Sequence, residues 1–181
     1  QIGLGIMGLA DALIKLGLTY GEEDAVSVCD RIGFVMADTA IAASARLAKE
    51  LGAFPKCKVE EIMETPYFLA NTTEGTKELV RKYGLRNSQL LTIAPTGTLS
   101  TMLGISGGIE PIYANYYERK TESLHGEDVY YKVYTKIVKD FMEEHKVSDD
   151  RLLPDYFVTA MTLDYHQRID MQSIWQRHID A

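Results

Sequence analysis

The sequence has no excess of basic residues and no long apolar run. Its 19 Lys and Arg are outnumbered by 26 Asp and Glu, which leaves a formal charge of -7. Proteins bind nucleic-acid backbones mainly through surplus Lys and Arg, so we predict no nucleic-acid partner. No stretch approaches the roughly 18 apolar residues of a membrane span, and residues 1–20 lack the charged-then-apolar pattern of a secretory leader. We therefore expect a cytoplasmic protein with no membrane partner.

Cysteine is also scarce, and its placement gives no sign of a metal site. Cys29 and Cys57 are the only two, and neither lies at metal-ligand spacing from another cysteine or histidine. The four histidines form no ligand pair at helical spacing, so we predict no protein-bound metal. A reducing compartment would keep both cysteines as thiols. The 46% apolar and 25% charged content is typical of a globular protein, which excludes disordered and fibrous classes.

Apolar residues recur mostly at three- and four-residue spacing, which predicts a helix-rich protein. The expected helices cover residues 9–16, about 24–51, 59–63, about 73–83, about 128–145, and 169 onward. Gly17, Gly52 and Gly84 follow three of them, as glycines commonly do at helix C-termini. The alanines of the longest helix permit close packing against a neighbour. Its periodic positions are Val28, Ile32, Val35, Met36, Thr39, Ala40, Ala43 and Leu47.

Two segments favour strands instead. Residues 89–94 form a short apolar, partly β-branched run that ends at Pro95, which is typical of a buried strand. Residues 112–119 form a second candidate, and we expect the strands to be mostly parallel. The connections are short and include no linker. The sequence therefore predicts one α/β domain over residues 1–181.

The most informative segment directly follows the first predicted strand. Residues 95–101, Pro-Thr-Gly-Thr-Leu-Ser-Thr, have five hydroxyl or glycine positions in seven. Glycine lets a backbone approach an anion and adopt unusual dihedral angles, and hydroxyls can donate to phosphate oxygens. A helix that starts near Leu99 would direct free amides at the charge. The composition therefore fits a phosphate site without a basic side chain, and it fits equally a strand-to-helix turn capped by Thr96 or Thr98.

Two segments at a fixed spacing are together far more specific than either alone: Ala94-Pro95-Thr96-Gly97-Thr98 and Gly104-Ile105-Ser106-Gly107-Gly108-Ile109-Glu110-Pro111-Ile112-Tyr113-Ala114. The pair closely resembles segments in the large subunits of ribonucleotide reductases. The resemblance extends to Arg31 and the segments 3–11 and 172–178, so it spans nearly the whole chain. The sequences Thr-Gly-Thr in the loop and Ser-Gly-Gly before Ile109 are most similar to the adenosylcobalamin-dependent (class II) branch.

The resemblance implies the fold and chemistry of that family. Its catalytic domain is a ten-stranded α/β barrel, in which a cysteine on a finger loop becomes a thiyl radical and ribonucleotides are reduced by a dithiol. For this chain it implies a helix-rich fragment of such a barrel, from a parent enzyme that is a homodimer. The implied substrate is a ribonucleoside diphosphate, the implied cofactor is adenosylcobalamin, and the implied reductant is thioredoxin-like.

The resemblance also implies which residues act on the substrate. The radical cysteine would lie upstream of Gln1, because neither Cys29 nor Cys57 matches its motif. We therefore expect no catalytic residue in this chain and no activity from the chain alone. The substrate's phosphates would be bound by Pro95, Thr96, Gly97, Thr98 and Leu99, with Ser100 and Thr101 as adjacent candidates and Glu110 and Pro111 shaping the neighbouring wall.

Two rival functions remain open. The glycines of Gly3-Leu4-Gly5-Ile6-Met7-Gly8 formally match the dinucleotide fingerprint and suggest an NAD-dependent hydroxy-acid dehydrogenase. That fingerprint requires a second strand ending in an acidic residue about 20 positions on. Here Glu22, Glu23 and Asp24 open a predicted helix, which disfavours this interpretation. The other rival is a helical interaction domain whose 24–51 helix docks a partner.

Two further motifs are interpreted structurally. Residues 164–169 approach the Asp-x-His-x-x-Gly pattern of some cobalamin enzymes, but Ile169 replaces the glycine. We therefore interpret His166 as a residue at the start of a helix. Six tyrosines could in principle form a radical relay, but their strand and helix spacing favours a packing role. They are Tyr113, Tyr116, Tyr117, Tyr130, Tyr131 and Tyr134.

Overall fold

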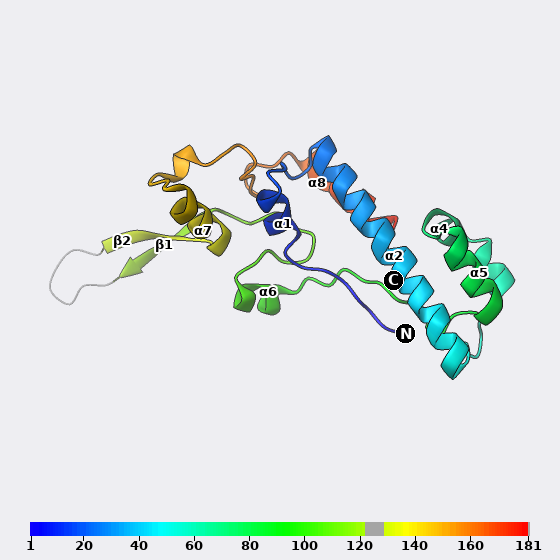
Figure 1. Ribbon diagram of the computed structural model, residues 1–181. Helices are drawn as coiled ribbons and strands as arrows, with labels where there is room; N and C mark the ends of the chain where they lie inside the picture. Colours follow the sequence, from blue (N-terminus) through cyan, green and yellow to red (C-terminus); the bar gives the residue numbers. More distant parts are fainter. Residues whose placement is uncertain (122–128, 181) are drawn as a thin grey trace. The chain divides into compact units, whose positions relative to one another are not determined.

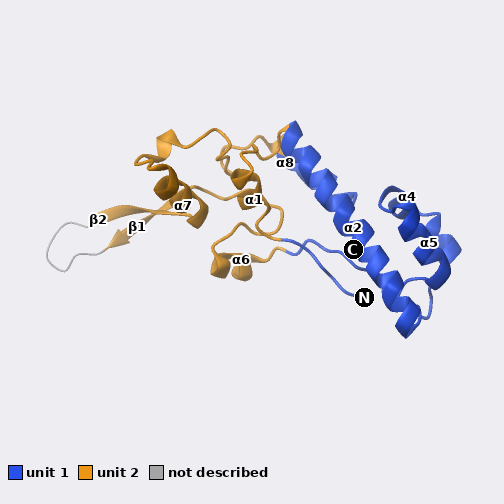
Figure 2. Cartoon of the chain, viewed as in Figure 1, with its two compact units in different colours: residues 1–6, 23–94, 168–181 blue, residues 7–22, 95–167 orange. Residues whose placement is uncertain are grey.

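The computed structural model describes residues 1–121 and 129–180. Contacts within the chain divide it into two compact units, each built from segments that are distant in the sequence (Figure 2). Unit 1 comprises residues 1–6, 23–94 and 168–181, and unit 2 comprises residues 7–22 and 95–167. Each unit has an apolar core of its own.

Unit 1 is built on the long helix α2 (Glu23–Leu51), which packs against α5 (Glu74–Tyr83) (Figure 1). The short helices α3 (Val59–Met63) and α4 (Pro66–Ala70) connect the two in the chain. The predicted helices at 24–51, 59–63 and 73–83 are thus confirmed. Helix α4 was not predicted, although Thr65 caps it and Pro66 occupies its first turn. Among the described residues, no helix has the length and apolar content needed to cross a bilayer.

The buried face of α2 differs from the stripe that its larger apolar residues predict. Ile32, Val35 and Leu47 are 37%, 59% and 45% exposed. The residues that face the core are mainly small, which lets neighbouring elements approach the helix closely. The expected close packing of alanines is therefore confirmed, whereas the large apolar stripe is the wrong face. The core-facing residues are Ala25, Cys29, Gly33, Ala37, Ile41, Ala42, Ser44, Ala45 and Ala48.

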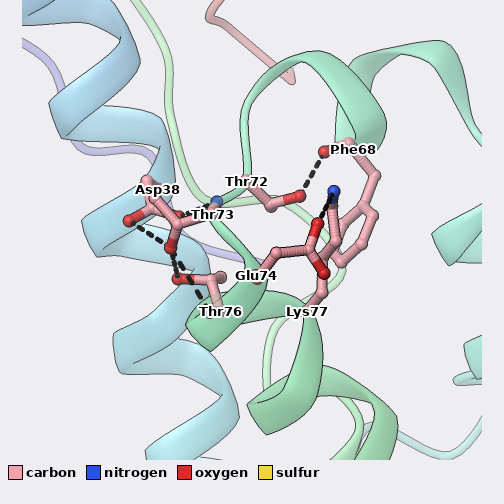
Figure 3. Close-up of polar contacts among 7 residues, drawn as sticks. All are labelled: Asp38, Phe68, Thr72, Thr73, Glu74, Thr76 and Lys77. Atoms are coloured by element: carbon pink, nitrogen blue, oxygen red, sulfur yellow. Dashed lines mark hydrogen bonds and ion pairs between the residues drawn. The ribbon is translucent and has the colours of Figure 1, made fainter.

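Polar contacts fix the start of α5 against α2 (Figure 3). Thr73 caps the helix, and its Oγ1 accepts a hydrogen bond from the backbone N of Thr76. Asp38 of α2 accepts hydrogen bonds from the backbone N of Thr73 at 2.8 Å and from its Oγ1 at 3.1 Å. One residue earlier, Thr72 donates to the carbonyl oxygen of Phe68 at 2.6 Å. The cap is thus held from both its own helix and the neighbouring one.

A buried histidine joins three elements of unit 1. Nδ1 of His178 lies 2.5 Å from Oδ1 of Asn71, and its Nε2 lies 2.9 Å from Oδ1 of Asp30. The Nδ2 of Asn71 donates to the carbonyl oxygens of Tyr67 and Arg177, so the oxygen of this amide faces the ring. Both ring nitrogens therefore have oxygen partners, and the ring connects the residues after α8 (Tyr165–Gln176) to α2 and to the end of α4.

Two extended segments of unit 1 pair in parallel. Leu4 donates from its backbone N to the carbonyl oxygen of Leu90 at 2.9 Å and accepts from the backbone N of Thr92 at 2.9 Å. This pairing places Leu4 opposite Leu91. Leu90 and Leu91 are buried. The predicted buried strand at 89–94 is therefore present as a short parallel pairing with the N-terminal segment.

Unit 2 combines short helices with a hairpin (Figure 1). The hairpin is formed by β1 (Tyr116–Thr121) and β2 (Val129–Tyr134), which pair antiparallel. Its helices are α1 (Leu9–Lys15), α6 (Gly97–Leu103), α7 (Lys136–His145), a 3-10 turn (Asp150–Leu152) and the first turn of α8. Its core is formed by Ile14, Ile112, Ile137, Val138 and Phe157.

The hairpin corrects two expectations. The helix expected from 128 begins only at Lys136, because Val129 to Tyr134 form β2; residue 128 itself lies outside the described residues. Five of the six residues of β2 are β-branched or aromatic, which favours a strand. The strand expected at 112–119 divides into β1 and an isolated parallel bridge between Ile112 and Thr159. Parallel pairing is thus limited to two isolated bridges in the described residues. Tyr116 and Tyr134 pack edge to face, as expected. The expected packing is wrong for the other four tyrosines, which are exposed: Tyr113, Tyr117, Tyr130 and Tyr131.

Candidate phosphate-binding loop

The hydroxyl- and glycine-rich loop leads directly into α6, which begins at Gly97 rather than near Leu99. Thr96, at the N-cap position, has φ 51° and ψ 23°, a left-handed conformation that β-branched residues rarely adopt. Gly97 has no positive φ. The unusual dihedral angles expected of the glycine therefore fall on Thr96. The alternative of a helix capped by Thr96 or Thr98 is wrong in its capping, because Thr96 makes no side-chain capping bond and Thr98 lies inside the helix.

The hydroxyls of the loop divide into two groups. Ser100 Oγ and Thr101 Oγ1 both donate to the carbonyl oxygen of Gly97, at 3.1 and 2.8 Å, and so are turned along their own helix. Thr96 Oγ1 instead accepts from the backbone N of Gly108 at 2.9 Å, which leaves its own proton available. Thr98 is exposed. Of the four hydroxyls, those of Thr96 and Thr98 are therefore the better placed to donate to a ligand.

The backbone at the start of α6 is open. The first hydrogen bond of the helix runs from the backbone N of Ser100 to the carbonyl oxygen of Thr96 at 2.8 Å, so the amides of residues 97–99 precede it. Gly97, Thr98 and Leu99 are exposed. A Cβ built on Gly97 would meet no atom within 4 Å. An anion could therefore approach these three amides directly.

A glycine-containing turn packs directly on the loop. A Cβ on Gly107 would lie 3.1 Å from the carbonyl oxygen of Pro95, so the absence of a side chain permits this approach. Ser106, at the start of the turn, accepts from the backbone N of Gly8 at 2.8 Å and donates from its own backbone N to Oδ2 of Asp11 at 2.7 Å. Three segments that carry the reductase resemblance thus meet within unit 2.

The turn continues into the residues that were expected to shape the wall of the site. Glu110 donates from its backbone N to the carbonyl oxygen of Gly107 at 3.0 Å and is exposed, whereas Pro111 is buried. Tyr20 fixes the turn from the other side through a buried hydrogen bond from its hydroxyl to the carbonyl oxygen of Ile109, at 2.7 Å. Glu110 and Pro111 therefore lie directly after the turn that packs on the loop.

The two cysteines lie in unit 1 and have structural surroundings. Cys29 is fully buried in α2, and desolvation raises the pKa of its thiol to about 11, which keeps it protonated and unreactive at neutral pH. Cys57 Sγ accepts a hydrogen bond from the backbone N of Leu85 at 3.4 Å. Within residues 1–121 and 129–180, no group of three or more His, Cys, Asp or Glu is arranged to hold a metal ion.

The remaining motifs have local explanations. α8 begins at Tyr165, and Asp164 accepts a hydrogen bond from the backbone N of His166 at 2.8 Å, so His166 is a helix-start residue as expected. The dinucleotide interpretation is wrong, because Glu23 and Asp24 form the first turn of α2 where a second strand would have to end. The contribution of Asp11 was not predicted, and its signal in the sequence is an acidic residue in an otherwise apolar helix start.

Comparison with known proteins identifies the family. Residues 1–181 match the family model described as the ribonucleotide reductase barrel domain. The ribonucleoside-diphosphate reductase subunit alpha of Chlamydia muridarum is 32% identical over 99% of this chain, which covers 20% of that protein. The vitamin B12-dependent ribonucleoside-diphosphate reductases of Thermoplasma acidophilum and Mycobacterium tuberculosis are 31% and 30% identical over the whole chain, which covers 23% and 26% of them. The chain therefore belongs to the ribonucleotide reductase family, and its 181 residues match the barrel domain of that family.

Proposed function

We propose that residues 1–181 form part of a single catalytic barrel domain in a ribonucleoside-diphosphate reductase and that residues 95–99 bind the phosphates of the substrate. The relatives described above are named as diphosphate reductases, which supports a diphosphate substrate. The chain spans only about a fifth to a quarter of their length. The proposal therefore concerns what this segment contributes to a longer enzyme.

The open backbone at Gly97 is the observation that carries the proposal. Its φ is not positive and a Cβ would meet no atom within 4 Å, so neither conformation nor packing within the chain requires a glycine there. A ligand that must touch the backbone would require one. The adjacent amides of Thr98 and Leu99 are also outside the helical hydrogen-bond pattern. This arrangement supports recognition of an anion by backbone N–H groups.

Phosphate binding here would depend on hydrogen bonds more than on charge. Residues 95–103 include no Lys or Arg, and α6 has only seven residues, so its dipole contributes little. Amides of residues 97–99 and the hydroxyls of Thr96 and Thr98 would donate to the phosphate oxygens. Because the phosphates are separate from the reacting ribose, these contacts would position the sugar without taking part in the chemical step.

We assign the radical source to adenosylcobalamin because two of the relatives are named as B12-dependent and match the chain along its whole length. When bound, this cofactor would supply the radical that initiates catalysis. His166 does not fit the axial-histidine motif of cobalamin enzymes, because its ring is hydrogen-bonded to Asp164 and Ile169 replaces the glycine of that motif. Assays of the full-length enzyme with and without adenosylcobalamin test the assignment.

A dithiol reductant and a homodimeric parent enzyme complete the proposal. Replacing the 2′-hydroxyl of ribose with hydrogen consumes two electrons and two protons and releases water, and a dithiol that is oxidised to a disulfide supplies both. Cys29 is buried with a raised pKa, which is unsuitable for this exchange. The reducing cysteines and the thioredoxin-like donor would therefore come from outside residues 1–181, and we expect the chain alone to be inactive.

The decisive experiment is Gly97→Val in the full-length reductase. The valine would occupy the space where the backbone meets phosphate, and losing a hydrogen bond to a charged group costs roughly 1.5 to 3 kcal/mol, or about ten- to a hundredfold in kcat/KM. The loss should fall mainly on KM, because phosphate contacts are remote from the reacting carbon. Steady-state kinetics with a ribonucleoside diphosphate measures both constants.

Gly75→Val is the matched control, because a Cβ on Gly75 also meets no atom within 4 Å and this residue lies in the first turn of α5. We expect the control to keep kcat/KM within about twofold of the wild type. Radical formation should survive in both variants. A folded Gly97→Val enzyme with unchanged kcat/KM would show that this loop does not bind the phosphates.

A further inference from the structure

Asp11 is a buried carboxylate with a backbone partner close to the loop. It lies in the first turn of α1, is 8% exposed, and accepts a hydrogen bond from the backbone N of Ser106 at 2.7 Å. In the described part of the chain, none of the ion pairs includes Asp11. Burying a carboxylate without a cation is unfavourable unless hydrogen bonds compensate. The hydrogen bond from Ser106 therefore compensates for burying the carboxylate of Asp11.

Ser106 is fixed to α1 on both sides of its Cα atom. Its backbone N donates to Asp11, and its carbonyl oxygen accepts from the backbone N of Gly8 at 2.8 Å. The residue is buried, so these bonds are shielded from water. The turn that begins at Ser106 consequently has a defined position relative to α1.

The same turn contacts the loop and so fixes the position of Thr96. Two residues after Ser106, the backbone N of Gly108 donates to Oγ1 of Thr96 at 2.9 Å. The intervening Gly107 packs on Pro95 so closely that a Cβ would lie 3.1 Å from the carbonyl oxygen. Thr96 has a left-handed backbone that a threonine adopts only when its surroundings hold it there. This conformation sets the direction in which the backbone enters α6.

We propose that Asp11 is a positioning residue for substrate phosphates: through Ser106 and Gly108 it holds Thr96 in its left-handed conformation and thereby aims the open amides of residues 97–99. The inference rests on the proposed function of the loop. The hydrogen bond of Asp11 is to Ser106, which lies outside the loop residues 95–99. Its removal should therefore weaken phosphate recognition while leaving the recognition of the base and sugar unchanged.

The test compares two ligands in the full-length reductase, a ribonucleoside diphosphate and the same ribonucleoside without phosphates. We expect Asp11→Ala to raise the dissociation constant of the diphosphate by about tenfold and to leave that of the ribonucleoside within about twofold. In turnover, KM for the diphosphate should rise more than kcat falls. Equal weakening of the binding of both ligands in a folded Asp11→Ala enzyme would overturn the proposal.

Asp11→Asn keeps the size of the side chain and an acceptor oxygen but removes the charge. We expect a selective loss of about threefold for the diphosphate, because a neutral acceptor binds an N–H more weakly than a carboxylate does. If Asp11→Ala does not fold, wild-type selectivity in the Asn variant overturns the proposal by itself. Asp24→Ala is the matched control, since Asp24 is an exposed first-turn aspartate of α2 and should change neither constant.

Gly97→Val separates this inference from the proposal on which it rests. A selective loss of diphosphate binding in Gly97→Val with none in Asp11→Ala would retain the phosphate loop and reject the role of Asp11. Wild-type diphosphate binding in both variants would reject both. A selective loss in both variants, larger in Gly97→Val, is the expected result.

Discussion

Gly5 and Gly33 of unit 1 have surroundings opposite to those of Gly97, which begins α6 in unit 2. In unit 1, a Cβ on Gly5 would lie 2.1 Å from the carbonyl oxygen of Thr92, and a Cβ on Gly33 would lie 2.4 Å from Cδ2 of His178. In unit 2, a Cβ on Gly97 would meet nothing within 4 Å. Atoms of the chain itself therefore require the first two glycines, whereas nothing in the chain requires the third.

This difference separates folding from ligand binding. A glycine whose missing side chain is replaced by a neighbour contributes to packing, so its substitution is expected to reduce stability. An open glycine with an ordinary φ can be substituted without strain, so a loss of function at that position points to a ligand. Substituting each glycine and measuring the free energy of unfolding distinguishes glycines needed for packing from an open glycine.

Gly5→Ala should have the largest effect. The added methyl would overlap the carbonyl oxygen of Thr92, whose backbone N is hydrogen-bonded to Leu4 in the parallel pairing. A backbone atom cannot move aside without breaking this pairing, so we expect a loss of about 3 kcal/mol or more. Urea unfolding followed by circular dichroism measures it. Stability within about 0.5 kcal/mol of the wild type would contradict the close approach.

Gly3→Ala provides an informative comparison with Gly5→Ala. Its Cβ would meet a side-chain atom, Cγ2 of Thr92 at 2.6 Å, instead of backbone. Thr92→Ser removes that methyl and keeps the hydroxyl. We therefore expect Thr92→Ser to recover most of the loss caused by Gly3→Ala and none of the loss caused by Gly5→Ala.

Gly33→Ala should have an intermediate effect. In an exposed helix interior this change would stabilise by about 0.5 to 1 kcal/mol, but here the methyl would overlap the His178 ring. The ring cannot turn away easily because Asn71 and Asp30 hold both nitrogens. We expect a net loss of about 1 to 2 kcal/mol. In a His178→Ala background the same change should become stabilising, and a loss of equal size there would show that His178 is not the cause.

Gly75→Ala and Gly97→Ala should have the smallest effects. Both positions lie in the first turn of a helix, lack a positive φ and leave room for a Cβ. Each alanine should leave stability unchanged or raise it by about 0.5 kcal/mol, because it restricts the unfolded chain. Chemical unfolding of the two variants side by side checks this. A loss above about 1 kcal/mol at Gly97 alone would mean that the loop is packed instead of open.

Helices defined by local signals were predicted well. The bounds of α2, α3 and α5 follow from apolar spacing and from glycines that end helices, and α5 also has a threonine cap. The prediction fails at Val129 to Tyr134, where a helix was expected and β2 forms. Its strand depends on pairing with β1, and the sequence of one strand does not reveal its partner.

The candidate site was predicted in composition but only partly in geometry. Residues 95–101 were recognised from their hydroxyls and glycine, and the family assignment followed from their pairing with residues 104–114. The left-handed Thr96, the bonds of the Ser100 and Thr101 hydroxyls to Gly97, and the contribution of Asp11 were not predicted. The hydroxyl bonds are local to α6, whereas the contacts of Thr96 and Asp11 are made with a turn that is distant from Asp11 in the sequence.

The sequence by itself indicated the family, the bounds of α2, α3 and α5, and the segment proposed to bind phosphate, because these depend on residue types at short spacing. Only the tertiary structure decided which face of α2 is buried, because that depends on the elements that pack against the small residues of the helix. It also decided that Asp11 is linked to Thr96 through Ser106 and Gly108. That link joins residues far apart in the chain, and only packing brings them within hydrogen-bonding distance.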